Sequence, residues 1–393
     1  MNRDIIFMGC RGYTKKYGGW ETFIQNLIKN WNDNETRFFV VELVYSKEEE
    51  GYEVVDNVNC IRIYSKLKGK PELLVTGVKF LFQYGSIVKK FNIKKPILYV
   101  MGSHVGVIFP FLKYKFKKTN TRIVHNPAGM EWKRKKYNFI MRKYSYLSRM
   151  IFIRTSVDCL VSDNPGVFRF YKDKFKRSAQ KQNYIAYGTY KAPIISDEMP
   201  KNVSNYFNEF GIRPREYYLV LGRCVPENNY ELILREFLNS NTKKDLIIIC
   251  NNNYENKYFQ KLRTTIPFEK DSRVKFIGTC YDSEILNYVR QLATAYIHGH
   301  SVGGTNPGLL EAMSATDVNI LYDVVFNREV GKDCALYFGN DDNSKSLSEV
   351  FLYVEALSDD ERKDLGMRAK ERMHTEYNWK KIVTQYKELF HQL

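Results

Sequence analysis

The sequence lacks the patterns that would indicate a metal site, a disulfide framework or export. Its seven cysteines are scattered over 393 residues with no close pair, so we expect neither a zinc knuckle nor disulfides, and a reducing compartment fits best. The chain runs straight into the apolar stretch 5–8, unlike a signal peptide. No acidic cluster has metal-ligand spacing. We therefore predict a cytoplasmic protein with no metal and no cofactor.

Long hydrophobic runs and familiar nucleotide-loop fingerprints are also missing. The stretch 96–112 has no formally charged residue, but it is shorter than the ~20 residues of a membrane span and contains Ser103, His104 and Pro110. We expect a strand, a loop and a short buried helix there. The glycines after the first predicted strand follow neither G-x-G-x-x-G nor G-x-x-x-x-G-K-[ST], which disfavours those two cofactor classes.

What the sequence does contain is a regular alternation of short apolar strands and amphipathic helices. Strands are expected at 5–8, 38–44, 60–64, 97–101, 122–125, 159–162, 183–185, 218–221, 246–250, 274–277, 295–298 and 319–322, and helices between them include 21–31, 231–239, 283–292, 308–314 and 346–357. Hydrophobic residues make up 44% of the chain, and the alternation is typical of doubly wound parallel-sheet α/β domains. We predict two Rossmann-like domains, at 1–190 and 216–375, facing a central cleft where strand ends would hold ligands. A proline-containing linker is expected at 191–215, and a helix at 376–393 is expected to pack back on the N-terminal domain.

Acidic residues are scarce in the first half. Residues 1–200 carry a net charge of +19 and residues 201–393 a net charge of −2, within a total of +17. Between Lys113 and Arg154, thirteen basic residues and interleaved aromatics accompany one acid, Glu131. Such a face suits anionic lipid, a pyrophosphate or nucleic acid, although many charge runs are only solvated surface. The aromatics favour a membrane surface.

The most informative stretch, 298–313, joins a glycine loop to the start of a helix. A predicted strand ends at His298, Gly303 and Gly304 permit a tight turn, and Pro307 suits the first turn of a helix. A helix N-terminus carries about half a positive charge and unpaired N–H groups, so it stabilises a phosphate. A connection without any ligand is an equally good interpretation of this loop alone.

Two other predicted strands also end in candidate ligand loops. Gly18 and Gly19 leave room for a ligand to approach the backbone, unless they serve only the turn. Arg223 follows the first strand of the second half. A guanidinium there can hold a diphosphate with two hydrogen bonds or, alternatively, pair with Glu227.

Together these motifs resemble the retaining glycosyltransferases of family 4, which have the GT-B fold. That resemblance rests on residues 17–21, 222–229 and 303–311. More narrowly, the chain is similar to the bacterial rhamnosyltransferase branch, which builds capsule and cell-wall polysaccharide. The narrower likeness rests on residues 125–134, 162–166, 187–190 and 298–313.

The resemblance implies a nucleotide-sugar co-substrate, dTDP-L-rhamnose. The enzyme would transfer the rhamnose, with retention of its anomeric configuration, to a hydroxyl of a lipid-diphosphate-linked saccharide. This acceptor would lie at the anionic inner face of the bacterial membrane. Arg223 would neutralise the diphosphate and Glu311 would bond the ribose. The predicted catalytic residues are Arg223, Glu131 and Arg134, although Glu131 is equally suited to a salt bridge. The predicted donor-binding residues are Gly18, Gly19, Arg223, Asn228, His298, Gly303, Gly304, Thr305, Asn306 and Glu311. The predicted acceptor-binding residues are Arg11, His125, Ala128, Glu131 and Arg134.

Three positions depart from the family pattern. Asn228 stands where the wider family has a lysine, and Gly303 where it has a glutamate; both changes fit the rhamnosyl branch and indicate a different sugar. Ala128 stands where the branch usually has an aspartate. Either that carboxylate is dispensable, or this enzyme is weakened or altered.

Other interpretations stay open. A related transferase would use another nucleotide sugar, of the UDP-glucose type, and a sugar-nucleotide 2-epimerase shares the fold. An inactive scaffold is a further alternative because of the three departures. A nucleic-acid-binding protein is disfavoured, because the second half is nearly neutral and contains no recognisable nucleic-acid module.

Overall fold

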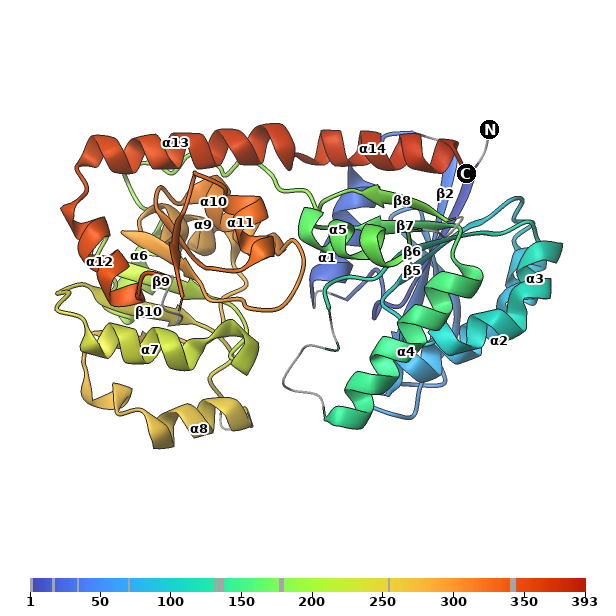
Figure 1. Ribbon diagram of the computed structural model, residues 1–393, viewed down its shortest axis with the longest axis horizontal. Coiled ribbons are helices and arrows are strands. Elements are labelled where there is room, and N and C mark those ends of the chain that lie inside the picture. Colours follow the sequence, from blue (N-terminus) through green and yellow to red (C-terminus); the bar gives the residue numbers. More distant parts are fainter. Residues whose placement is uncertain are drawn as a thin grey trace. The chain divides into compact units, whose positions relative to one another are not determined.

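The computed structural model describes residues 3–15, 18–33, 35–69, 71–130, 132, 138–176, 180–253, 255–339 and 344–393 (Figure 1). The chain forms two compact units. Unit 1 comprises Met1–Gly188 and Trp379–Leu393, and unit 2 comprises Thr189–Asn378. Residues 191–215, predicted as a linker, belong to unit 2 and include helix α6 (Lys201–Glu209).

The described residues of unit 1 form an eight-stranded sheet in the order β3-β4-β2-β1-β5-β6-β7-β8. Its strands pair in parallel except for β3 and β4, an antiparallel hairpin at one edge. Asp56 and Asn57 turn this hairpin with φ of 48° and 64°, as a two-residue turn of type I′ requires. The elements are β1 (Arg3–Met8), α1 (Gly19–Lys29), β2 (Thr36–Val44), β3 (Gly51–Val55), β4 (Val58–Tyr64), α2 (Glu72–Lys90), β5 (Ile97–Met101), η1 (Gly106–Leu112), α3 (Lys113–Lys118), β6 (Arg122–Asn126), α4 (Phe139–Ser156), β7 (Cys159–Ser162), α5 (Pro165–Lys174), β8 (Lys181–Tyr184) and α14 (Trp379–His391).

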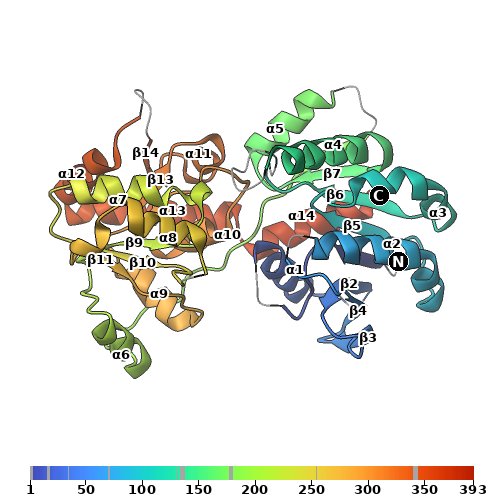
Figure 2. The ribbon, with the colours of Figure 1, turned by 90° about the horizontal axis from the view of Figure 1, so that it is seen from below.

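The two faces of this sheet bury different helices, because alternate residues of a strand point to opposite faces. Ile6 and Met8 of β1 belong to the core shared with α2, α3 and α4, which lie next to one another in Figure 2. Phe7 instead contacts Tyr99, with ring centroids 5.3 Å apart. The Tyr99 hydroxyl shares a 2.8 Å hydrogen bond with Tyr386 of α14, so the C-terminal helix completes this second face.

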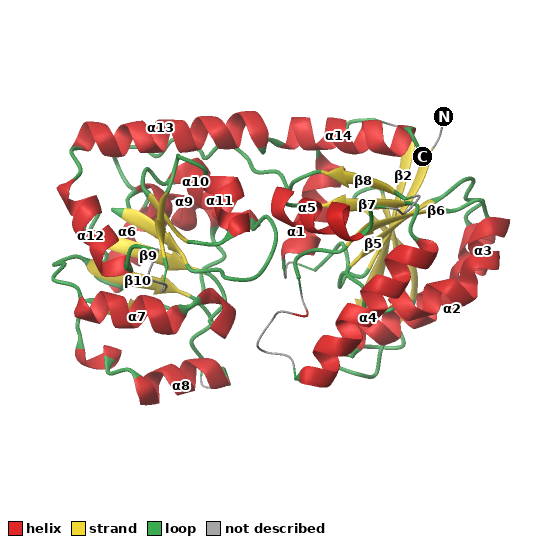
Figure 3. Cartoon of the chain, viewed as in Figure 1, coloured by secondary structure: helices red, strands yellow, loops and turns green. Residues whose placement is uncertain are grey.

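The described part of unit 2 forms a parallel sheet of six strands in the order β11-β10-β9-β12-β13-β14. Figure 3 draws its strands in yellow among red helices. The two parallel-sheet units confirm the predicted α/β class. The central strands are apolar and buried, as strands covered on both faces must be. The elements after α6 are β9 (Tyr217–Leu221), η3 (Pro226–Asn228), α7 (Tyr230–Asn239), β10 (Asp245–Ile249), α8 (Lys257–Thr265), η4 (Phe268–Lys270), β11 (Val274–Phe276), α9 (Ser283–Gln291), β12 (Ala295–His298), α10 (Pro307–Ala315), β13 (Asn319–Tyr322), α11 (Val325–Gly331), β14 (Leu336–Phe338), α12 (Leu347–Ala356) and α13 (Asp359–Glu376).

Candidate functional site

In unit 2, the loops that follow β9 and β12 lie against each other. The two strands are parallel neighbours, so the two loops leave the sheet at the same edge. The N–H of Ser301 donates to the carbonyl of Glu227 (2.8 Å), and the side-chain amide of Asn229 donates to the carbonyl of Gly299 (2.9 Å). The loop of Arg223 is thus joined to the loop that leads into α10.

Arg223 stands at the exposed end of β9. Its guanidinium has no hydrogen-bond or ion-pair partner among the described residues, and the alternative pairing with Glu227 is not formed. Its main chain is fixed, because the buried Asn228 donates from Nδ2 to the Arg223 carbonyl (2.8 Å). Asn228, expected to contact the donor, therefore uses its amide to shape the turn. An unpaired guanidinium on a fixed turn is available to an anion.

Helix α10 begins at Pro307, one residue before the expected start, and this proline lies in the first turn as predicted. Asn306 caps it by accepting the N–H of Gly308 on Oδ1 (2.9 Å). Gly303 and Gly304 are half-buried, Thr305 is buried, and a side chain at Gly303 would meet open space. The cap occupies one of the N–H groups that an anion would bind, so the positive end of α10 is partly satisfied from within the chain.

His298 is buried at the end of β12. Burial holds the pKa of its ring well below the ordinary value, and the neighbouring His300 adds to this effect. Nδ1 lies 3.1 Å from the Tyr296 hydroxyl, and the ring stacks on His300 with centroids 4.2 Å apart. Nε2 has no partner within the described structure. A neutral ring thus supports the base of the loop and leaves one polar atom unsatisfied.

Glu311 on α10, implied to bind a ribose, is held by Arg290 of α9. Nη2 of Arg290 lies 2.5 Å from Oε2 of Glu311, and the carboxylate side chain is 45% exposed. The ion pair therefore orients a carboxylate that solvent still reaches. The sequence held no signal for Arg290, because only the packing of α9 beside α10 brings together residues 21 positions apart.

Gly299 and Gly303 provide a matched test of the loop contact. A Cβ on Gly299 would lie 2.2 Å from the carbonyl oxygen of Asn228, whereas a Cβ on Gly303 would meet nothing within 4 Å. Gly299→Ala is therefore expected to lower the free energy of unfolding by about 1–3 kcal/mol. Gly303→Ala is expected to change it by less than about 0.5 kcal/mol. Urea unfolding of both variants measures the difference, and equal effects would refute the close contact.

In unit 1, buried carboxylates hold the loop that follows β1. Glu21 accepts the N–H of Arg11 (2.8 Å), and Glu42 accepts the N–H of Thr14 (3.0 Å). Glu72 accepts from Nε of Arg11 (2.8 Å). Arg11, expected at the acceptor, is therefore already paired with a buried carboxylate. Removing that partner would leave the carboxylate buried without its counter-charge.

Gly18, which precedes α1, has φ of 120°, a conformation that favours glycine. Gly18 and Gly19 are exposed, but a Cβ on Gly18 would come within 2.7 Å of the Glu21 carboxylate. Burial raises the pKa of Glu21. A carboxyl group under this turn suits a hydroxyl donor such as a sugar, and when ionised it would repel a phosphate.

His125 lies inside unit 1 and not at an open surface. It is fully buried, with Nδ1 3.0 Å from the Val100 carbonyl and Nε2 3.1 Å from Oγ of Ser103. Ser103 also accepts from Nε of the fully buried Arg149 (3.0 Å). Both ring nitrogens of His125 are thus occupied and no part of the ring reaches solvent. The acceptor contact of His125 stays a prediction, and it would require the ring to give up one of these two partners.

Ala128 is buried and has φ of 53°, a left-handed conformation that costs most residues about 1–2 kcal/mol. Oδ1 of Asn126 accepts its N–H (2.8 Å). Aspartate tolerates this conformation better than alanine, so the residue usual in the rhamnosyl branch would fit the backbone. The predicted catalytic and acceptor residues Glu131 and Arg134 lie outside the described residues.

The buried His125 predicts acid sensitivity of unit 1. Burial, and secondarily the charge of Arg149, lowers its pKa to about 3, whereas the unfolded ring titrates near 6.5. Between these values the unfolded state binds the extra proton, so stability falls as pH falls. The loss from pH 7 to pH 5 is expected to be about 2 kcal/mol.

The four tryptophans, at positions 20, 31, 132 and 379, all belong to unit 1, so tryptophan fluorescence during urea unfolding follows this unit. His125→Gln is expected to remove the acid-dependent loss, and His104→Gln serves as the control. The comparison between variants cancels the opposite contribution of Glu21, whose pKa is raised. Full acid sensitivity in His125→Gln would contradict the assignment.

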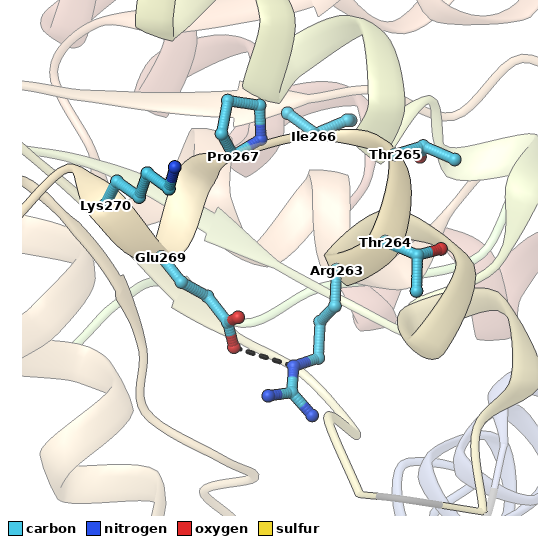
Figure 4. Close-up of a pocket in the computed structure, with 7 residues that line it drawn as sticks. All are labelled: Arg263, Thr264, Thr265, Ile266, Pro267, Glu269 and Lys270. Carbon is cyan, nitrogen blue, oxygen red and sulfur yellow. Dashed lines mark hydrogen bonds and ion pairs between the residues drawn. The ribbon is translucent and has the colours of Figure 1, made fainter.

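A hollow of about 260 Å³ lies between the end of α8 and η4. Arg263 and Glu269 form an ion pair across it (2.6 Å) (Figure 4). Helix α8 runs back from the carboxyl ends of the strands, so its last residues lie at the amino-terminal edge of the sheet, opposite Arg223. The hollow is therefore not part of the candidate site.

Sequence comparison identifies one partial match. Residues 2–190 match the family described as a domain of unknown function, DUF1972. Comparison with curated proteins gives no significant match.

Solved structures share the fold over the full chain. A sucrose-phosphate synthase from Thermosynechococcus elongatus has a TM-score of 0.80 at 15% identity, covering 99% of this chain and 98% of that one. HepE from Anabaena, in complex with UDP, has a TM-score of 0.71 at 11% identity, covering 100% of both. An α,α-trehalose-phosphate synthase (UDP-forming) from Burkholderia xenovorans, in complex with glucose-6-phosphate, has a TM-score of 0.72 at 13% identity, covering 98% and 99%. The fold is GT-B, as predicted.

Proposed function

We propose that this protein is a retaining glycosyltransferase that moves L-rhamnose from dTDP-L-rhamnose to a hydroxyl of a lipid-diphosphate-linked saccharide during bacterial surface polysaccharide synthesis. The observation that carries the proposal is Arg223, an exposed guanidinium without a partner among the described residues, on a turn fixed by Asn228. The GT-B fold, and the UDP bound in the HepE structure, support a nucleoside diphosphate as its ligand.

The proposed reaction needs no protein nucleophile. The bond between the anomeric carbon and the diphosphate oxygen breaks, and the acceptor oxygen bonds to that carbon on the same face. The departing diphosphate oxygen takes the acceptor proton. The chain then contributes position and electrostatics. Arg223 and the N-terminus of α10 stabilise charge developing on the diphosphate, and Glu311, oriented by Arg290, binds the ribose.

A donor panel tests this proposal. Thermal unfolding with dTDP-L-rhamnose, UDP-glucose and other nucleotide sugars ranks their affinities, because a ligand that binds only the folded state raises stability by about 2.7 kcal/mol at a hundred times its Kd. We expect dTDP-L-rhamnose to give the largest shift and to transfer its sugar to a lipid-diphosphate-linked acceptor. Absence of any shift across the panel would contradict a donor site in this chain.

A transferase of the UDP-glucose type is the second candidate, favoured by the UDP in one structure of this fold. A larger shift with UDP-glucose would select it. A 2-epimerase would convert the donor without any acceptor. An inactive scaffold would remain inert after Ala128→Asp, whereas an enzyme weakened at this position would gain activity.

A further inference from the structure

Helix α4 leaves large apolar side chains in solvent. Phe139 and Ile140 in its first turn are 68% and 75% exposed. Leu147 and Ile151 are also exposed, and their positions seven and eleven residues after Ile140 place all three on one face of the helix. Single exposed apolar residues are ordinary, but a row of them marks an interaction surface.

Elements packed near α4 also carry exposed aromatic side chains. Phe109 of η1 packs on Phe152 of α4, with ring centroids 4.2 Å apart. Lys115 of α3 donates to the carbonyl of Phe82 in α2 (3.0 Å). These elements lie together in Figures 1 and 2, and Phe111 and Tyr114 on them are 86% and 79% exposed. The apolar surface of unit 1 is defined as Phe82, Phe111, Tyr114, Phe139, Ile140, Leu147 and Ile151.

Basic side chains accompany this surface, while acids are nearly absent. Between positions 73 and 157 the sequence contains one acidic residue, Glu131. Aliphatic and aromatic groups beside cations match an interface that offers both acyl chains and anionic headgroups. A nucleic acid would use the cations and the aromatic rings but would gain little from exposed Ile140, Leu147 and Ile151. Exposed cations on α2, α3 and α4 include Lys89, Lys90, Lys113, Lys117, Lys118, Arg142 and Lys143.

We propose that the apolar surface of unit 1 docks on an anionic lipid bilayer. Phe139 and Ile140 enter the boundary between headgroups and acyl chains, and Lys117 and Lys118 of α3 contact the headgroups. Among the described helices, none combines the length and apolarity needed to span a bilayer. The inference rests on the proposed function in one respect: docking would bring the protein to its lipid-linked acceptor. Vesicle binding itself is measured without any transfer reaction.

Co-sedimentation of the full chain with vesicles tests the proposal. Binding to phosphatidylcholine vesicles containing phosphatidylglycerol is expected to be roughly a hundred-fold tighter than to phosphatidylcholine alone. The double variant Phe139→Ser/Ile140→Ser is expected to bind the anionic vesicles roughly ten-fold more weakly and to lose the binding that resists high salt. Lys117→Gln/Lys118→Gln is expected to bind roughly twenty-fold more weakly at low salt.

Matched controls come from unit 2. Leu352 and Tyr353 are also adjacent, exposed and apolar, and Lys261 and Lys270 are exposed lysines. Leu352→Ser/Tyr353→Ser and Lys261→Gln/Lys270→Gln are expected to bind vesicles as the natural protein does.

Equal binding to neutral and anionic vesicles, or unchanged binding by Phe139→Ser/Ile140→Ser, would overturn the proposal. Duplex DNA that competes with vesicles, combined with loss of binding in the lysine variant alone, would assign the surface to a polyanion and also overturn it. Transfer to a water-soluble acceptor is expected to be unchanged in the serine variant. Failure of the docking is therefore distinguishable from failure of the transferase proposal.

Discussion

Arg223→Ala is expected to lower the turnover of glycosyl transfer by about 10²–10³-fold while the protein stays folded. The guanidinium would lie on the leaving diphosphate, and one preorganised contact to charge developing in a transition state is worth about 2–4 kcal/mol. Because the side chain is exposed and has no partner among the described residues, its loss should change the free energy of unfolding by less than about 0.5 kcal/mol.

Two further variants define the cause. Arg223→Lys keeps the charge but loses the planar two-point contact, so it should recover only part of the turnover. Arg235→Ala removes an exposed arginine of the same unit, one that pairs with Glu231 on α7 (2.9 Å), and should transfer normally. Steady-state rates with saturating donor and acceptor measure all three. Near-normal turnover in a folded Arg223→Ala variant would remove Arg223 from the reaction.

The sequence predicted the central strands best, because strands covered on both faces are continuous apolar runs. Predicted strands at 97–101, 159–162, 295–298 and 319–322 coincide with β5, β7, β12 and β13. Strand β3 was missed because it is mostly exposed and carries no buried pattern. The sequence did not predict helix α13, because polar residues lie on nearly all sides of this helix. Only Gly366, Ala369 and Met373 are buried, and the first two are small. A Cβ on its Gly366 would lie 2.6 Å from the Asp317 carboxylate.

Site residues were predictable where the local chain geometry sets their position, as at Pro307. They were less predictable where the packing of helices sets the position of a side chain. His125 ends a strand in the sequence, but α4 covers it and turns it into a core residue. The positioning partner Arg290 and the buried Arg149 each lie on a helix whose sequence looks like an ordinary polar or basic face. Only the tertiary structure shows that they point inward.

Arg149→Ala is expected to destabilise unit 1 by about 3–5 kcal/mol. The fully buried guanidinium donates from Nε to Oγ of Ser103 (3.0 Å) and from Nη1 to the Gly129 carbonyl (2.9 Å) and the Tyr171 hydroxyl (3.0 Å). It also lies 4.9 Å from the centroid of the Trp132 ring. Alanine would leave these buried oxygens without a donor and open a cavity beside them, and each unsatisfied buried group costs about 1–3 kcal/mol.

Urea unfolding followed by tryptophan fluorescence measures this loss in unit 1. Arg154→Ala, which truncates an exposed arginine of the same helix, should stay within about 0.5 kcal/mol of the natural protein. Arg149→Met keeps most of the volume and isolates the cost of the missing donors. Because the charge of Arg149 helps to lower the pKa of His125, removing it should raise that pKa and reduce the loss of stability between pH 7 and pH 5. An Arg149→Ala variant as stable as Arg154→Ala, or one that keeps the full acid sensitivity, would contradict the central role of this guanidinium.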